Sequence, residues 1–242
     1  ETDPLVIIPI QPHGSAPPLY AVHVLGNNGS FFRPLAKELG TSQPLFGLTV
    51  GLLSDDTPTT VEDIARFYLD QIDRHQPEGP VSLVAVSAGC YVTFELAQQL
   101  TAAGRTVNAL VFLDSTGPGG RPRATGLGKF VAHARLFTRH PGAYVRKTFT
   151  TKFEERRHSS ARKKLMNEDG QFVDANSIAA FVAANTLSIE RYKPEPYSGR
   201  ITVIRAGHDL FDTAEARNTG LGWGAVAAGG LVVYEVPGEH LT

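Results

Sequence analysis

Short apolar runs alternate with longer amphipathic segments through most of this chain. Residues 81–86 are nearly all apolar, which is typical of a strand buried on both faces of a sheet. From Val61 the apolar positions instead recur every three or four residues, which predicts a helix with one buried face. Thr60 is its expected N-cap, with Asp63 three residues later. Such alternation predicts an α/β protein with a mostly parallel sheet and helices on both faces.

The other expected elements continue this alternation. Strands are expected at residues 18–25, 44–50, 107–114, 201–206 and 231–237, and helices at 31–40 and 88–104. Residues 118–190 interrupt the pattern between two strands. Their helical character is irregular, and they are interpreted as an inserted helical lid.

The composition limits the class of protein. The chain of 242 residues is long enough for one large α/β domain with a sizeable core. The chain contains no run of 18 apolar residues, so no membrane-spanning helix is predicted, and no signal peptide is recognised. The only cysteine, Cys90, excludes an internal disulfide and fits a reducing, cytoplasmic compartment. Because the chain begins at Glu1 and its only methionine is Met166, we expect a piece of a longer protein.

Charge is distributed unevenly along the chain. The formal net charge is −1, which predicts neither a nucleic-acid partner nor a membrane surface. Residues 121–164 nevertheless hold 13 of the 23 Lys and Arg residues and only two acids, Glu154 and Glu155. We call this range the basic segment. It has two interpretations that the sequence leaves open: a solvated helical face, or a docking surface for an acidic partner.

A serine stands where the buried strand 81–86 meets the next helix. The sequence there is Ala85-Val86-Ser87-Ala88-Gly89, close to the G-x-S-x-G nucleophile elbow of α/β-hydrolases. Small neighbours allow a tight, strained turn that exposes the hydroxyl at the carboxyl edge of the sheet. The pattern also occurs at ordinary strand–helix turns, so the motif by itself leaves that alternative open.

A nucleophilic serine needs a base, and the base needs an acid that orients it. In α/β-hydrolases the order along the chain is Ser, then Asp or Glu, then His. His240 follows the last expected strand and is the candidate base. Asp114 ends the strand after the elbow and is the candidate acid. The rivals are Asp209 and Asp212 for the acid and His208 for the base.

Two backbone N–H groups are expected to form an oxyanion hole. One belongs to Ala88, at the start of the helix behind Ser87. The other is assigned to Val24 or Leu25, in a loop of small, turn-forming residues after an early strand. His23 in this loop is interpreted as a structural residue. The sequence contains no cluster of metal ligands, so a chemistry without metal or bound cofactor is expected.

Beyond these motifs, the chain as a whole resembles a known family, the thioesterase domain that ends non-ribosomal peptide synthetases and polyketide synthases. The similarity covers nearly the whole chain. It rests on the blocks FFRPLAKELG, TVEDIARFYLDQI, QPEGPVSLVAVSAG, FELAQQL, VFLDS, YKPEPYSGRITVIRA and GWGAVAAGGLVVYEVPGEH. This chain departs from the family pattern at Ala85, Cys90 and Ser115, where Gly, Gly and Thr are usual. None of these changes removes a catalytic group, and Cys90 is interpreted as a packing residue.

The resemblance implies an α/β-hydrolase fold with a helical lid and favours Asp114 as the acid. It implies that residues 1–17 link the domain to an upstream acyl or peptidyl carrier domain. The implied reaction transfers a chain from the carrier's phosphopantetheine thioester to Ser87 and releases it by hydrolysis or macrocyclisation. An acidic carrier would make Arg162, Lys163 and Lys164 candidate docking residues. The alternatives are a separate editing (type II) thioesterase, a non-catalytic hydrolase-fold binding module, and a general lipase or esterase.

Overall fold

The structure is a computed structural model that describes residues 7–22, 29–50, 56–118, 178–207 and 219–238. Within these ranges the chain forms one sheet of seven strands in the order β1-β3-β2-β4-β5-β6-β7. The strands are β1 (Ile7–Gln11), β2 (Leu19–Val22), β3 (Leu45–Leu48), β4 (Val81–Val86), β5 (Val107–Leu113), β6 (Ile201–Ala206) and β7 (Leu231–Val236). All neighbouring pairs are parallel except β1 and β3. The predicted mostly parallel sheet is therefore confirmed.

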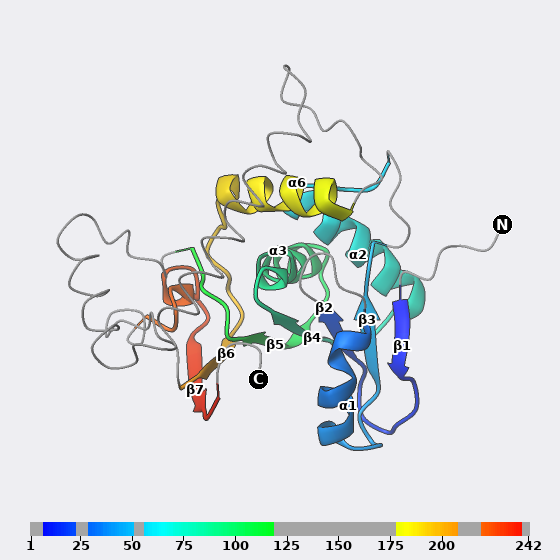
Figure 1. The fold of residues 1–242 in the computed structure, drawn as a ribbon. Coiled ribbons are helices and arrows are strands. Elements are labelled where there is room, and N and C mark those ends of the chain that lie inside the picture. The colour runs from blue at the N-terminus through cyan, green and yellow to red at the C-terminus, as the bar shows by residue number, and fades with distance from the viewer. Residues whose placement is uncertain (1–6, 23–28, 51–55, 119–177, 208–218, 239–242) are drawn as a thin grey trace.

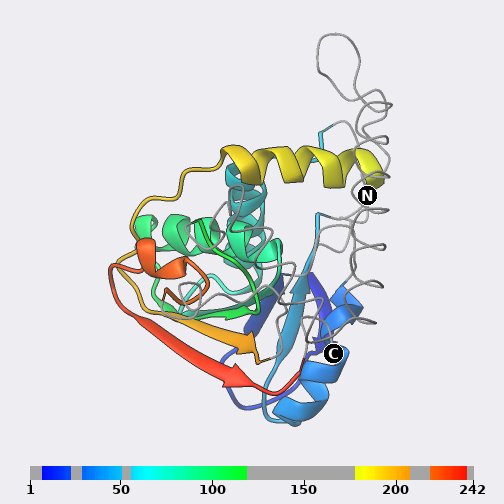
Figure 2. The same cartoon turned by 60° about the vertical axis from the view of Figure 1, so that its left-hand side comes forward.

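Helices cover the sheet on both faces (Figures 1 and 2). The described helices are α1 (Arg33–Leu39), α2 (Val61–His75), α3 (Gly89–Ala102) and α6 (Ile178–Arg191), with short 3-10 turns η1 (Gly29–Phe32) and η2 (Trp223–Ala225). Helices α2, α3 and α6 lie on one face, and η1 with α1 lies on the other (Figure 1). None of the described helices is both long and apolar enough to cross a bilayer.

Alternate strand residues face two separate cores, as the period of two in a strand requires. The larger core lies beneath α2, α3 and α6 and includes Tyr20, Leu83, Phe112, Val203 and Trp223. The smaller core lies beneath η1 and α1 and includes Ala21, Phe32, Ala36, Val84 and Val86. Since β4 contributes to both cores and all six of its residues are buried, the expectation of a strand buried on both faces is confirmed.

Helix α2 begins as its sequence predicts. The Asp63 N–H donates to Thr60 Oγ1 at 3.1 Å, and the Thr60 hydroxyl donates to the Asp63 carboxylate at 2.6 Å. Its buried residues follow the predicted spacing and are Val61, Ile64, Ala65, Tyr68, Leu69 and Ile72. The helix is held to α6 where the Val61 N–H donates to Ser188 Oγ at 2.8 Å.

One strand of the sheet was not predicted from the sequence. Residues 7–11 were assigned to a linker, yet they form β1, which adds an antiparallel edge strand to the sheet. The strand expected at 18–25 is therefore the second strand, described as Leu19–Val22. Of the expected lid, 118–190, the structure describes residue 118 and residues 178–190, and the latter form all of α6 except Arg191. The basic segment lies outside the described residues.

Candidate active site

Ser87 follows β4 directly and stands one residue before the N-cap of α3. Its φ is 52°, in the left-handed region that residues other than glycine rarely adopt. A non-glycine residue held there costs on the order of 1–3 kcal/mol, and such residues cluster at functional sites. The strained turn expected from the small neighbours of Ser87 is therefore present.

Backbone contacts hold this turn in place. The Ser87 N–H donates to the Leu113 carbonyl at 3.4 Å. The Ser87 carbonyl accepts the Cys90 N–H at 3.1 Å and the Ser115 hydroxyl at 2.7 Å. The Ser87 side chain is half-buried, and its hydroxyl has no hydrogen-bond partner among the described residues. These contacts therefore fix the backbone of the turn without using the Ser87 hydroxyl.

A buried tryptophan supports the elbow from behind. Trp223 is 0% exposed, and its Nε1–H donates to the Ser115 carbonyl at 2.9 Å. Its ring packs on Phe112 and Phe94 with centroids 4.4 and 5.5 Å apart. No role for Trp223 or Ser115 was predicted from the sequence. The one signal available was that Trp223 is the only tryptophan of the chain.

Asp114 lies beside Ser87 at the carboxyl edge of the sheet. Because Val86 pairs with Leu113 in register, Ser87 and Asp114 follow neighbouring strands whose axes are about 4.8 Å apart. The φ of Asp114 is 43°, a second left-handed residue at this edge. Its N–H donates to the Ile204 carbonyl at 2.7 Å, and its Oδ1 accepts the Ala206 N–H at 2.9 Å. The end of β6 therefore holds this carboxylate in one orientation.

The end of β6 is in turn joined to β7. Arg205 is 7% exposed and forms an ion pair with Glu235, its register partner. The Gly207 N–H donates to the Val236 carbonyl at 2.8 Å. The carboxyl ends of β5, β6 and β7 are thereby tied to one another around Asp114.

Ala88 is the N-cap residue of α3, with helical φ and ψ of −61° and −28°. Among the described residues its N–H donates to no oxygen, so this donor is available at the positive end of the α3 dipole. Val24 and Leu25, the other candidates for the oxyanion hole, lie outside the described residues. They follow β2, which is the neighbour of β4 in the sheet.

The remaining candidate residues lie in the other ranges of the chain. His240, with its rival His208, lies outside the described residues, as do His23, Asp209 and Asp212. Arg162, Lys163 and Lys164 are outside them as well. The last described residue before His240 is Gly238, just past the carboxyl end of β7. The roles of all these residues stay predictions.

Cys90 is not suited to act as a nucleophile. It is 0% exposed in the first turn of α3, and burial raises the pKa of its thiol to about 12. The thiolate is the reactive form of cysteine, and it is scarce at neutral pH with such a pKa. Its burial agrees with the interpretation of Cys90 as a packing residue. Within the described ranges no group of three or more His, Cys, Asp or Glu side chains is placed to hold a metal ion.

Comparison with known sequences gives a family match. The model described as "Thioesterase domain" matches residues 17–242. The dimodular nonribosomal peptide synthase of Bacillus subtilis (strain 168) is 35% identical over 112 residues, which are 46% of this chain and 5% of that protein. Chondramide synthase cmdD of Chondromyces crocatus is 24% identical over 258 residues, covering 98% of this chain and 6% of that protein. The chain thus spans only a small part of the length of these relatives.

Solved structures share the fold. The NocB thioesterase domain, in a covalent complex with a fluorophosphonate nocardicin G analog, aligns with a TM-score of 0.66 at 22% identity, over 97% of this chain and 90% of that one. The surfactin thioesterase domain SrfTE gives 0.58 at 21%, over 97% and 86%. The type II thioesterase BorB gives 0.62 at 20%, over 99% and 91%. The predicted α/β-hydrolase fold is confirmed.

Proposed function

Because this chain belongs to the thioesterase domain family, we propose that it releases an acyl or peptidyl chain from a carrier-bound phosphopantetheine thioester, with Ser87 as the nucleophile. The observation that carries the proposal is the left-handed backbone of Ser87, at φ 52°, between the buried strand β4 and helix α3. An ordinary strand–helix turn has no need of that strain, whereas a nucleophile elbow requires it to expose the hydroxyl.

The first step is acylation of the serine. His240 takes the proton of the Ser87 hydroxyl, and Oγ bonds to the thioester carbonyl carbon. The Ala88 N–H and one from Val24 or Leu25 hold the resulting oxyanion, each donor worth about 3–4 kcal/mol in comparable serine enzymes. The C–S bond then breaks, and the phosphopantetheine thiol leaves with the proton from His240. The acyl chain remains as an ester on Ser87.

The second step frees the chain. His240 removes a proton from water, which gives an acid, or from a nucleophile within the chain, which gives a ring. That nucleophile attacks the Ser87 ester, and the serine recovers its proton as the C–O bond breaks. Asp114 holds the imidazole in the productive tautomer and stabilises its positive charge. Its anchorage to the Ala206 N–H, at 2.9 Å, supports this role because an orienting acid must itself be held.

The proposed partner is an upstream carrier domain, in the same chain or in an associated synthase. This fits relatives that are long synthetases of which this chain spans 5% and 6%. We further propose that Arg162, Lys163 and Lys164 of the basic segment help to dock that carrier. Reversing them to Glu should raise KM for a carrier-bound thioester and leave a small soluble thioester unaffected, because rim charges act on encounter more than on chemistry.

A separate editing thioesterase is the second candidate function. It is kept as an alternative because the chain shares its fold with BorB, a type II thioesterase, at a TM-score of 0.62, as well as with the NocB domain at 0.66. Both functions use the same serine chemistry, so substrates must separate them. An editing enzyme should prefer short acyl groups on several different carriers. A terminal domain should prefer the long chain on its own upstream carrier.

The test of the serine chemistry is covalent labelling followed by mass spectrometry. A fluorophosphonate probe should add one phosphonyl group to Ser87, with the Oγ–P bond replacing P–F. The same peptide should carry an acyl group after incubation with an N-acetylcysteamine thioester. Ser87→Ala should abolish both adducts and all turnover while the far-UV circular dichroism stays unchanged. Labelling of the Ser87→Ala variant, for example on Cys90, would show that the nucleophile is another residue.

A further inference from the structure

The direction of β1 places the incoming chain at the catalytic edge. Strand β1 is antiparallel to β3, and its first residue, Ile7, pairs with Leu48, the last residue of β3. Strand β2 pairs in parallel with both β3 and β4. The carboxyl ends of β3 and β4 therefore lie at the same edge of the sheet. Any domain that precedes Ile7 is therefore joined to this edge, where Ser87 stands.

The entry point is close to the nucleophile across the sheet. Strands β1 and β4 are three positions apart in the order β1-β3-β2-β4, which is about 15 Å at 4.8 Å per strand. The six residues before Ile7 reach at most about 20 Å when extended. A domain attached through them is held near the β1 side of the sheet unless the chain before residue 1 adds length.

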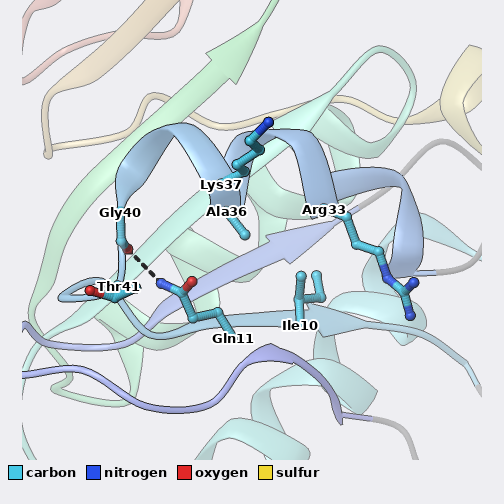
Figure 3. Close-up of a pocket in the computed structure, with 7 residues that line it drawn as sticks. All are labelled: Ile10, Gln11, Arg33, Ala36, Lys37, Gly40 and Thr41. Carbon is cyan, nitrogen blue, oxygen red and sulfur yellow. Dashed lines mark hydrogen bonds between the residues drawn. The ribbon is translucent and has the colours of Figure 1, made fainter.

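A hollow lies between α1 and the far end of β1 (Figure 3). Its β1 residues are Ile10 and Gln11, and Gln11 pairs with Leu45, the first residue of β3, so this end of the hollow lies away from Ile7. The hollow has a volume of about 420 Å³. Its lining residues are Ile10, Gln11, Arg33, Ala36, Lys37, Gly40 and Thr41. Figure 3 shows Arg33 at one end of the hollow, Gly40 and Thr41 at the other, and Lys37 on the helix between them. Arg33 is the first residue of α1, which follows the 3-10 turn η1.

Two of the residues that line the hollow, Arg33 and Lys37, are positively charged. Arg33 and Lys37 are one helical turn apart, and both are exposed. None of the seven lining residues has a carboxylate. Glu38 is the only acidic residue in the described ranges 7–22 and 29–50, and it does not line the hollow. The Gln11 amide donates to the carbonyls of Gly40 and Gln43, both at 2.6 Å, and so joins the end of β1 to the segment that follows α1.

An apolar side chain adds to this surface at the start of α1. Phe31 in η1 is 38% exposed, although Phe32 beside it is buried in the smaller core. Aromatic residues and Arg are enriched at protein interfaces, so the exposed Phe31 close to Arg33 favours a protein partner over a small anion. The partner that fits is a protein surface with carboxylates and an apolar residue.

We propose that Phe31, Arg33 and Lys37, with the hollow beside them, form a docking surface for an acidic helix of the carrier domain that precedes this chain. This inference rests on the proposed function, because it takes the upstream domain to be a carrier. The covalent attachment at the catalytic edge supplies the high local concentration, and the two cations select the orientation of the carrier. The surface is separate in sequence from the basic segment, so the two can be tested independently.

The experiment compares two substrates and two matched double variants. Arg33→Glu/Lys37→Glu reverses the proposed surface, and Arg66→Glu/Arg200→Glu reverses two exposed cations on α2 and before β6. Each protein is assayed with an acyl thioester on the phosphopantetheine of the carrier domain encoded immediately upstream, added as a separate domain, and with the N-acetylcysteamine thioester of the same acyl group. The first variant should raise KM for the carrier substrate about tenfold, and the effect should fade as salt increases from 0.01 to 1 M. The soluble substrate should change less than about twofold, because rim charges do not touch the reacting atoms.

The outcomes separate the docking surface from the proposed function. If the wild-type domain turns over neither thioester, the proposed function fails and the inference fails with it. If it turns over both but Arg33→Glu/Lys37→Glu changes them equally or not at all, only the docking surface is refuted. An equal effect from Arg66→Glu/Arg200→Glu also refutes it, because general charge would then explain the result. Chemical-shift changes of the wild-type domain on adding the carrier should centre on Phe31 and α1, and changes confined to other surfaces would contradict the proposal.

Discussion

The backbone strain at Ser87 can be measured without any substrate. Its φ of 52° is the conformation that glycine adopts freely and that a Cβ atom disfavours. Ser87→Ala keeps the Cβ, and Ser87→Gly removes it. Both variants lose the hydroxyl, which has no partner among the described residues, so their difference isolates the backbone term. We expect the glycine variant to be the more stable of the two.

The size of the difference follows from two opposing terms. A side chain in the left-handed region costs about 1–2 kcal/mol. Glycine loses more conformational freedom on folding, which returns about 0.5–1 kcal/mol in favour of alanine. The free energy of unfolding should therefore be about 0.5–1 kcal/mol higher for Ser87→Gly than for Ser87→Ala. For a domain of this length, 1 kcal/mol corresponds to a Tm change of about 2–4 °C.

Ser82 provides the matched control within the same strand. It is buried in β4, next to the register shift between Val81 and Ser82, and it is not among the residues with a positive φ. Its Oγ is 3.4 Å from Asn108 Nδ2, a contact that both substitutions remove. Here glycine should be less stable than alanine by about 0.5–1 kcal/mol, because a strand interior disfavours it. The sign of the Gly–Ala difference should therefore invert between Ser82 and Ser87. Urea unfolding followed by tryptophan fluorescence gives all four values.

The same sign at both positions would refute the reasoning. It would mean that the backbone of Ser87 costs no free energy in solution and that β4 ends in an ordinary turn. The proposed serine chemistry would then no longer be supported by a strained backbone at Ser87, whatever the labelling shows.

Other predictions test the groups around the elbow. Asp114→Asn should lower kcat by up to about 10⁴-fold, the cost of a misoriented imidazole, and a larger loss for Asp209→Asn would assign the acid to Asp209 instead. Trp223→Phe should lower the free energy of unfolding by about 1–3 kcal/mol in urea unfolding, because the buried Ser115 carbonyl loses its hydrogen-bond donor. An unchanged unfolding midpoint would show that this hydrogen bond does not stabilise the domain. Iodoacetamide at pH 8 should label Cys90 only after unfolding, since burial raises the pKa of its thiol to about 12, and rapid labelling of the folded protein would contradict this. The pKa of this thiol is near 9.0 in the unfolded chain and about 12 in the folded one, so the folded state holds the proton to higher pH. Its contribution to the free energy of unfolding is therefore complete below pH 9 and is lost as the pH rises toward 12. Cys90→Ala should remove that part of the pH dependence.

Local patterns in the sequence were sufficient to predict the elements built from neighbouring residues. The N-cap at Thr60, the buried face of α2 and the burial of β4 all depend on spacings within one segment. The turn at Ser87 was predictable for the same reason, because so tight a turn is sterically possible only with small adjacent residues. Strand β1 was missed because Pro9 breaks its pattern and its backbone partners come from β3, about 40 residues later.

The sequence by itself determined the alternation of strands and helices, the elbow around Ser87 and the position of Asp114 at a strand end. Only the tertiary structure decided what holds them. Ser115 donates to the Ser87 carbonyl across 28 residues, and Ala206 donates to Asp114 across 92. The indole of Trp223 reaches Ser115 across 108 residues. Such contacts have no period or spacing along the chain, because they arise only when parallel strands bring distant segments to one edge of the sheet.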